Sequence, residues 1–322
     1  MDILQKIVES TKARVEREKA EITFNAMRKK AENLYKIQVA QCGGESSAES
    51  SLDSSGDSPI QFIKPPFAFE KALDLGESKR DSTQKSSDSR DLVPQIRFIC
   101  EVKKASPSKG IIAHDFPYLQ IALDYERAGA DCISCLTEPE FFKGADEYLS
   151  EIAKHTKIPV LRKDFIIDSY MIYQAKVLGA DCVLLISEIL GAEEMKEFCD
   201  IAHSLGLSVL VESHSESALQ NALKTNARLI GVNNRDLRDF KVDLQTSIRL
   251  KKLVPQEKIF VSESGIATHS DIALLQSHSI NAALIGETLM RKKDKTKALN
   301  ALKGCESMKS KSAESRSNKV RA

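Results

Sequence analysis

Eight short apolar segments, each ending in polar or charged residues, recur along the chain between residues 97 and 287. The stretches between them have apolar residues at helical spacing, with glycine or asparagine near their ends. Such regular alternation of strand and helix favours a parallel sheet with helical crossovers, and eight repeats fit closure into a barrel. The sequence therefore predicts an α/β fold, a single (β/α)8 TIM barrel with extra N-terminal helices. The eight segments are RFICEVKK (97–104), DCISCLTE (131–138), IPVLRKDF (158–165), ADCVLLISE (180–188), LSVLVES (207–213), ARLIGVNNRD (227–236), KIFVSESG (258–265) and INAALIGE (280–287).

The barrel is expected to span residues 92–304, which leaves both ends of the chain outside it. Residues 1–91 are predicted to form an N-terminal helical extension. Its first 38 or so residues carry an extended helical pattern that would pack beside the barrel. Two serine-rich insertions, at about 42–58 and 77–91, lack the apolar residues needed for a core and are expected to be mobile.

Between the two insertions lies FAFEKAL, residues 67–73, which has a short helical pattern. We expect this element to fold against the mouth of the barrel. The polar and basic tail, 305–322, is predicted to be disordered.

Composition excludes several classes of partner. The 47 basic and 46 acidic residues give a net charge of +1, so no global attraction to nucleic acid or membrane is expected, and anion recognition should be local. No segment approaches a membrane-spanning length and the start is amphipathic rather than a secretory signal, which favours the cytoplasm. The seven cysteines are expected to be reduced core thiols; Cys132 and Cys135 form an isolated CxxC on opposite faces of a strand, and no metal is predicted.

The first segment brings charge to the end of a predicted strand. Glu101 and Lys103 share one face of that strand, because successive side chains point to opposite faces. Charges inside a fold are costly unless they pair or serve a ligand. A salt-bridged strand end is the alternative explanation for this motif alone.

Similar residues follow the later strands. Lys163 lies between apolar neighbours, where desolvation is expected to lower the pKa of its ammonium and suit it to proton transfer. Glu212 ends an apolar run, which is expected to raise the pKa of its carboxyl toward that of a general acid or base. Asn233 and Arg235 follow the sixth strand, and a guanidinium can hold a carboxylate through two parallel hydrogen bonds.

The last two strands are followed directly by glycines, in SESG (262–265) and IGE (285–287). Barrels often bind phosphate at this place through backbone N–H groups. Each motif alone has a simpler explanation, as a surface ion pair, a charge at a helix start or a turn. Their joint occurrence at one end of successive strands predicts a site for a phosphorylated, carboxylated small molecule with an aromatic or apolar body.

Seven motifs resemble those of the indole-3-glycerol phosphate synthase family, over about residues 92–300. They are EVKKASPSKG, LTEPEFFKGADEYL, PVLRKDFIIDSYMIYQAKVLGAD, LVES, IGVNNRDL, VSESGI and GETLM. The resemblance implies ring closure of 1-(2-carboxyphenylamino)-1-deoxyribulose 5-phosphate, with loss of carbon dioxide and water and without cofactor or metal. It also implies a cytoplasmic monomer in tryptophan biosynthesis, with association with other enzymes of that pathway left open.

The same resemblance implies roles for individual residues. Lys163 would be the general acid of ring closure, and Glu212 and Lys103 would serve the later dehydration, with the division of acid and base roles open. Glu101 and Asn233 would orient the substrate. The other implied contacts are Glu263 with the ribulose chain, Ser106 and Arg235 with the carboxylate, Pro107, Phe142 and Phe165 with the ring, and Ser264, Gly265, Gly286, Glu287 and Lys103 with the phosphate.

Two other functions are possible for a barrel of this kind. A barrel related to phosphoribosylanthranilate isomerase would use a Cys/Asp pair, whereas the first strand here ends in Glu and Lys. A non-catalytic barrel that only binds a phosphate ligand would be expected to have lost at least one of Lys103, Lys163 and Glu212. The chain departs from the family pattern at Ala145, where serine is common, and in LVESHSES, where a more acidic run is usual.

Overall fold

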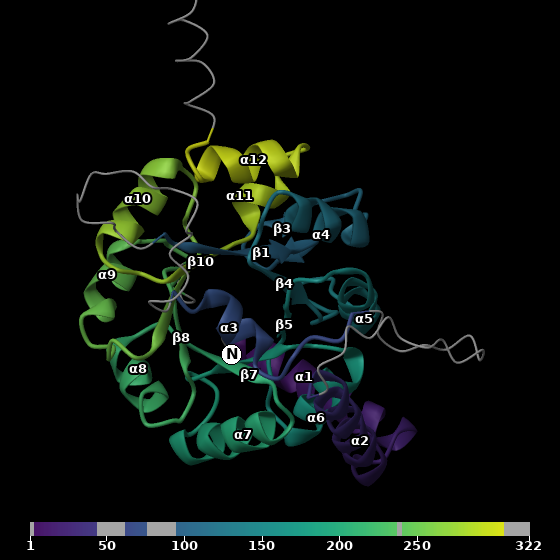
Figure 1. The fold of residues 1–322 in the computed structure, drawn as a ribbon. Helices are drawn as coiled ribbons and strands as arrows, with labels where there is room; N and C mark the ends of the chain where they lie inside the picture. Colours follow the sequence, from purple (N-terminus) through teal and green to yellow (C-terminus); the bar gives the residue numbers. More distant parts are fainter. Residues whose placement is uncertain (1–2, 44–61, 76–94, 237–239, 306–322) are drawn as a thin grey trace, which may run out of the picture.

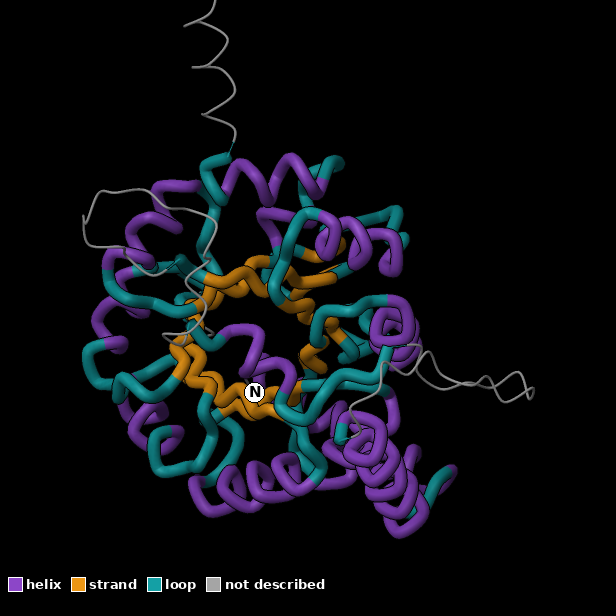
Figure 2. Tube along the Cα trace, in the orientation of Figure 1, coloured by secondary structure: helices purple, strands orange, loops and turns teal. Residues whose placement is uncertain are grey.

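The computed structural model describes residues 3–43, 62–75, 95–236 and 240–305. In this part of the chain eight parallel strands form a closed barrel in the order β1-β10-β9-β8-β7-β6-β5-β4, and helices surround it (Figures 1 and 2). The predicted (β/α)8 barrel is confirmed. Both serine-rich insertions, apart from Cys42 and Gly43, and the tail beyond Cys305 lie outside the described residues.

The barrel strands coincide with the eight predicted segments. They are β1 (Arg97–Val102), β4 (Cys132–Leu136), β5 (Val160–Lys163), β6 (Cys182–Ile186), β7 (Ser208–Ser213), β8 (Leu229–Asn233), β9 (Ile259–Glu263) and β10 (Ala282–Ile285). A small hairpin of β2 (Ala105–Ser106) and β3 (Gly110–Ile111) follows β1.

The helices of the barrel follow these strands in turn. They are α4 (Tyr118–Arg127), α5 (Asp146–His155), α6 (Ser169–Leu178), α7 (Ala192–Ser204), α8 (Glu216–Ala222), α9 (Gln245–Lys251), α10 (His269–Ser277), α11 (Glu287–Met290) and α12 (Lys295–Leu302). Outward-facing strand residues such as Ile133, Val183 and Phe260 pack under them in one large apolar core.

The inward-facing residues form a second core that carries the site. Ile99, Leu161, Leu210 and Ile259 meet inside the barrel, near the start of their strands. Side chains alternate along a strand, so the residues two and four positions further on face the same interior. Charged residues occupy several of these positions, so the strands carry them to the carboxyl end of the barrel; they are Glu101, Lys103, Lys163, Glu212 and Glu263.

The N-terminal extension contains two helices where the sequence suggested one extended pattern. α1 (Ile3–Glu21) and α2 (Phe24–Cys42) are separated at Ile22 and Thr23, and the extended backbone of Thr23 (ψ 152°) ends the first helix. α2 packs along α6, with an edge-to-face contact between Phe24 and Tyr173 at 5.6 Å. The start of α1 reaches the carboxyl end of the barrel instead.

The helix predicted at FAFEKAL is present as α3 (Ala68–Leu73), but its expected position at the mouth is wrong. This helix lies inside the ring of strands (Figure 2). Phe69 and Leu73 are fully buried and cluster with residues at the strand starts. The backbone N–H of Glu70 donates to Ser208 Oγ, at the first residue of β7, at 3.2 Å. α3 therefore closes the amino end of the barrel, opposite the charged residues.

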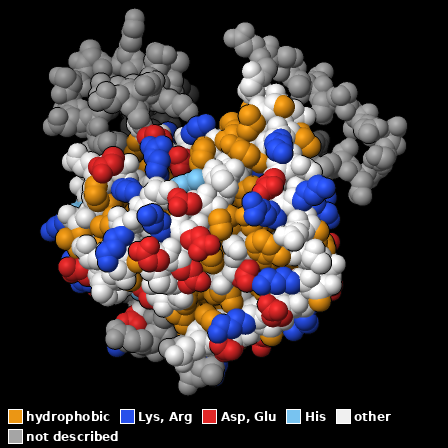
Figure 3. Space-filling model, turned by 90° about the horizontal axis from the view of Figure 1, so that it is seen from below, with side chains coloured by type: hydrophobic (Ala, Val, Ile, Leu, Met, Phe, Trp, Pro, Cys, Tyr) orange, Lys and Arg blue, Asp and Glu red, His pale blue; other side chains and the backbone are white. Residues whose placement is uncertain are grey.

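The molecular surface agrees with the balanced composition. On the face shown in Figure 3, basic and acidic side chains are interspersed rather than gathered by sign. Among the described helices, none combines the length and the apolar character that crossing a bilayer requires.

Candidate active site

A cavity of about 490 Å³ opens at the carboxyl end of the barrel. The strand ends and the loops after them form it, which is where barrel enzymes carry their sites. Every residue that the sequence singled out for the site lines this cavity. These residues are Glu101, Lys103, Ser106, Pro107, Phe142, Lys163, Phe165, Glu212, Asn233, Arg235, Glu263, Ser264, Gly265, Gly286 and Glu287.

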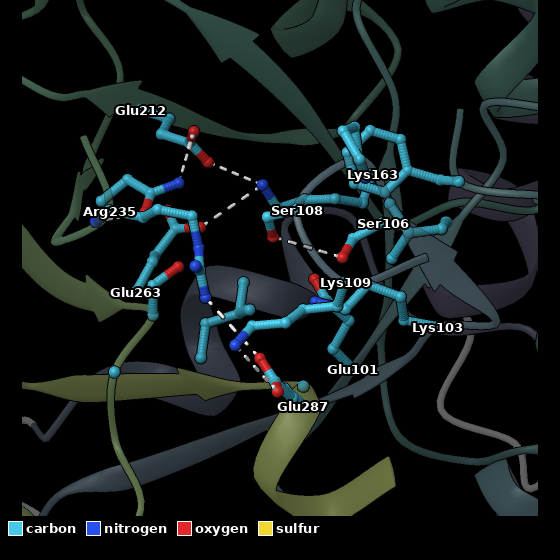
Figure 4. A pocket seen from close by; sticks show the side chains of 18 of the residues that line it. Glu101, Lys103, Ser106, Ser108, Lys109, Lys163, Glu212, Arg235, Glu263 and Glu287 are labelled. Carbon is cyan, nitrogen blue, oxygen red and sulfur yellow. Dashed lines mark hydrogen bonds and ion pairs between the residues drawn. The ribbon is translucent and has the colours of Figure 1, made fainter. Parts of the chain in front are cut away.

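Lys163, the last residue of β5, lies at the centre of the polar part of the cavity. Its Nζ is 2.6 Å from Glu212 Oε2 and 3.4 Å from Glu263 Oε2, so two carboxylates from β7 and β9 face one ammonium (Figure 4). The side chains are 12%, 4% and 2% exposed, respectively. Asn233 Nδ2 donates to the other oxygen of Glu212 at 3.1 Å. The ammonium is thus held in place yet still borders the cavity.

The expected pKa shifts of Lys163 and Glu212 are both wrong in direction. Burial alone would lower the pKa of Lys163, but Glu212, Glu263 and Glu101 outweigh it and raise that pKa above its ordinary value. Burial alone would raise the pKa of Glu212, but Lys163 and His214 lower it to about 2. The raised carboxyl pKa belongs to Glu263, through burial and the neighbouring Glu212 charge.

Lys103 and Glu101 form an ion pair beside this cluster. Both extend from the end of β1, and Glu101 is 4% exposed. Gly286 leaves the room they occupy, because a β-carbon at that position would overlap Glu101 Oε1 and approach Lys103 Nζ to 2.8 Å. The predicted first-strand pair and the predicted glycine after the last strand are therefore neighbours.

The loop after β9 has a special backbone. Ser264 (φ 68°) and Gly265 (φ 82°) both adopt left-handed conformations, which non-glycine residues rarely do. A β-carbon at Gly265 would also overlap the side chain of Val242. Such backbone outliers often mark ligand sites, and this one borders the cavity beside Gly286.

Arg235 is held by a carboxylate of the chain itself. Its Nη2 lies 3.7 Å from Glu287 Oε2, and Lys109 Nζ lies 3.8 Å from Glu287 Oε1 (Figure 4). Arg291 Nε donates to the same Oε1 at 2.9 Å. Three cations thus meet at the rim of the cavity, which makes this rim suited to anions.

The apolar part of the cavity has a wall and a cover. The rings of Phe142 and Phe165 lie 5.8 Å apart with an interplanar angle of 39°. Besides these rings, Ile3, Leu4 and Ile7 of α1 also line the cavity. The place of α1 in the site was not predicted, because its amphipathic pattern indicates that one face is buried but not which surface that face covers.

Sequence reasoning also missed His214, which follows β7 directly after the LVES motif. Its Nε2 is 3.5 Å from Glu212 Oε1, and its Nδ1 is 3.2 Å from Glu188 Oε2. The available signal was its position one residue beyond a strand end. Five of the cysteines, Cys132 and Cys135 among them, are buried, and no group of three or more potential ligands in the described ranges is arranged to hold a metal.

Comparison with known proteins is decisive for the family. The family model for indole-3-glycerol phosphate synthase matches residues 68–302. The chain belongs to the indole-3-glycerol phosphate synthase family. It is similar to the indole-3-glycerol phosphate synthases of Ruminiclostridium cellulolyticum (47% identity, covering 94% of this chain and 99% of the relative) and Endomicrobium trichonymphae (57% identity, covering 65% and 81%).

One solved structure illustrates how widely the architecture is shared. The crystal structure of KGPDC from Streptococcus mutans superposes with a TM-score of 0.51 at 13% sequence identity, covering 65% of this chain and 96% of that one. At this identity the likeness shows the barrel fold alone. The family assignment therefore rests on the sequence comparisons.

Proposed function

We propose that this chain is an indole-3-glycerol phosphate synthase that closes the indole ring with Lys163 as general acid. The substrate is 1-(2-carboxyphenylamino)-1-deoxyribulose 5-phosphate, and the products are indole-3-glycerol phosphate, carbon dioxide and water. The observation that carries the proposal is the Lys163 ammonium, held between two buried carboxylates and bordering a cavity with an aromatic wall and a cationic rim.

Ring closure joins an aromatic carbon to the ketone carbon of the sugar chain. A proton from Lys163 neutralises the developing alkoxide and makes the ketone carbon more electrophilic. The raised pKa of Lys163 supports this role, because the ammonium is fully protonated at neutral pH. Loss of the ring carboxylate as carbon dioxide then returns the bonding electrons to the ring system.

The last step removes the new hydroxyl group as water and a proton from the neighbouring carbon. This step needs an acid and a base. Glu212 is ionised, as its lowered pKa requires, and is therefore the base, while Lys103 is the acid. Glu101 pairs with Lys103, and Asn233 holds Glu212, so both partners are oriented.

The remaining residues bind the substrate. Pro107, Phe142 and Phe165 enclose the anthranilate ring, and Glu263 contacts the ribulose chain. Arg235 and Ser106 take the ring carboxylate, for which Arg235 exchanges its contact with Glu287. The phosphate is bound by the backbone N–H groups of Ser264, Gly265, Gly286 and Glu287 and by the charge of Lys103.

The synthase activity is tested directly. Purified protein is incubated with the carboxyphenylamino sugar phosphate, without added metal or nucleotide, and indole fluorescence is followed. Product formation supports the proposal, and no fluorescence with a folded protein contradicts it.

Lys163→Met tests the acid. The variant keeps an apolar stem of similar length but cannot donate a proton, so kcat is expected to fall by about a hundredfold or more. Lys196→Met, on the exposed surface of α7, is the matched control and should retain full activity. A near-normal kcat in Lys163→Met would remove this residue from its role.

We further propose that the enzyme works in the cytoplasm as a monomer, on one phosphorylated small molecule. The cationic rim supports the ligand class. Sedimentation of the purified protein tests the monomer, and co-sedimentation with other tryptophan-pathway enzymes tests association with them.

A further inference from the structure

His214 occupies an unusual place in the cavity wall. It follows the last residue of β7, and its side chain is 10% exposed. Its Nε2 lies 3.5 Å from Glu212 Oε1, while its Nδ1 lies 3.2 Å from Glu188 Oε2. The imidazole therefore lies between two carboxylates, Glu212, which lines the cavity, and Glu188, which does not.

Glu188 holds His214 at two points. Glu188 Oε1 accepts the backbone N–H of His214 at 2.7 Å, and its Oε2 faces the ring. The ring contact is an ion-pair approach without hydrogen-bond geometry, and the opposite ring nitrogen, Nε2, faces Glu212. A carboxylate that orients a histidine toward a working group is a recurrent arrangement in active sites.

The charges around His214 come from three strands. Glu188 follows β6, Glu212 lies next to the last residue of β7, and Lys163 of β5 is the neighbouring cation. Burial and Lys163 disfavour the protonated ring, but the two carboxylates prevail and raise the pKa of His214. These carboxylates therefore favour the positively charged form of His214 next to Glu212.

The charge of His214 bears on which of the two carboxyl groups beside Lys163 is ionised. Glu212 and Glu263 both face one Lys163 ammonium, and two buried carboxylates so close together do not ionise equally. Asn233 donates a hydrogen bond to Glu212, and His214 faces Glu212 at 3.5 Å as a charge partner without a hydrogen bond, whereas Glu263 Oε1 has no hydrogen-bond partner in the described part of the chain. The surroundings thus select Glu212 as the ionised member.

We propose that His214, oriented by Glu188, is a positioning residue that keeps the Glu212 carboxylate ionised and directed at Lys163. The inference rests on the proposed function, in which Glu212 is the base. His214 itself need not touch the substrate; it acts through Glu212.

The kinetic test compares His214→Gln, Glu188→Gln and the double variant. In His214→Gln the lost positive charge raises the pKa of Glu212, so the acidic limb of the kcat pH profile should move up by about one pH unit. Because Glu212, with a pKa of about 2 in the unchanged protein, stays ionised at neutral pH in this variant, kcat there should fall about tenfold through lost orientation of the carboxylate, with KM changed less than twofold. Because Glu188 acts through His214, the double variant should be no worse than His214→Gln alone.

The matched control is His155→Gln, which removes a histidine from a surface pair with Glu151 (3.9 Å, side chain 41% exposed). Its pH profile should match that of the unchanged protein. An unshifted acidic limb in folded His214→Gln would overturn the proposal, even if kcat fell. Additive effects of the two single variants would overturn the role of Glu188.

A second measurement needs no turnover and keeps the proposal testable if the histidine variants fail to fold. NMR titration follows the imidazole of His214, one of six histidines, in the unchanged protein and in Glu212→Gln. Loss of the carboxylate should lower the midpoint of His214; an unchanged midpoint would overturn the pairing. If the midpoint falls but the unchanged protein forms no indole product, the synthase proposal fails while the pairing stands.

Discussion

Two glycines create the room for the charged cluster at the level of single residues. Gly231 in β8 faces the barrel interior, and Glu263 Oε1 lies where its side chain would be. Gly286 does the same for Glu101. Glycine inside a strand weakens it and often marks a close approach. Here the close approach is that of two carboxylates lining the cavity, so the glycines belong to the candidate site although they carry no functional group.

Gly231→Ala tests this directly. The added methyl group would overlap Glu263 Oε1 and lie 3.2 Å from Leu210 Cδ1, so Glu263 must move away from Lys163. Small misplacements of catalytic groups cost on the order of a hundredfold in rate, so we expect a comparable loss of kcat. Gly191→Ala is the control, because no atom lies within 4 Å of a methyl group there. Equal activity of the two variants would contradict the argument.

The protonation states at this site could not be predicted from sequence. Apolar neighbours of Lys163 and Glu212 in the chain suggested opposite shifts from those observed, because the sequence shows local burial but not which charges meet across the barrel. Glu263 lies 100 residues beyond Lys163, yet its carboxylate is 3.4 Å from the lysine. The alternating pattern predicted which residues lie at the strand ends. It did not predict which of their charged side chains form ion pairs with one another.

At the level of elements, α1 is tied to the strand that carries Lys163. Arg14 Nη2 donates to Asp164 Oδ1 at 2.8 Å, and Asp164 is fully buried directly after Lys163 in the chain. Thr137 Oγ1 donates to the other oxygen of Asp164 at 2.6 Å. Burial would raise the pKa of Asp164, but Arg14 and Arg162 lower it, so the buried pair is ionised. This pair anchors the helix whose first turns cover the cavity.

Arg14→Met should therefore act on both stability and binding. Removing one partner leaves a buried charge, which costs about 3 kcal/mol in the free energy of unfolding, the low end for such changes because Arg162 remains. Loss of the cover at Ile3, Leu4 and Ile7 should raise KM more than it lowers kcat.

Thermal unfolding and steady-state kinetics of this variant provide the measurement. Arg17→Met, on the exposed face of the same helix, is the control and should change neither. An unchanged KM in Arg14→Met would show that α1 does not depend on this pair to cover the cavity.

For the whole molecule, periodicity predicted the barrel but not what closes each end. Eight apolar segments were sufficient to predict the barrel, because each was expected to form a parallel strand. The carboxyl ends of such strands lie together at one end of the barrel. FAFEKAL was predictable as a helix, yet an amphipathic pattern shows only that one face is buried. α3 and the start of α1 occupy opposite ends of the barrel, and their sequences alone did not distinguish the two positions. The packing of α3 thus stabilises the amino end of the barrel, and the candidate active site lies at the carboxyl end.

Phe69→Ala separates these two ends. Phe69 is fully buried among strand starts, and removing a buried phenyl group costs about 3–5 kcal/mol in the free energy of unfolding. The melting temperature should fall clearly, while kcat and KM measured well below it should remain within twofold, because the cluster at Lys163 lies at the opposite end. Lys71→Ala, exposed on the same helix, should leave both unchanged. A large loss of kcat in folded Phe69→Ala would mean that the amino end of the barrel also positions the catalytic residues.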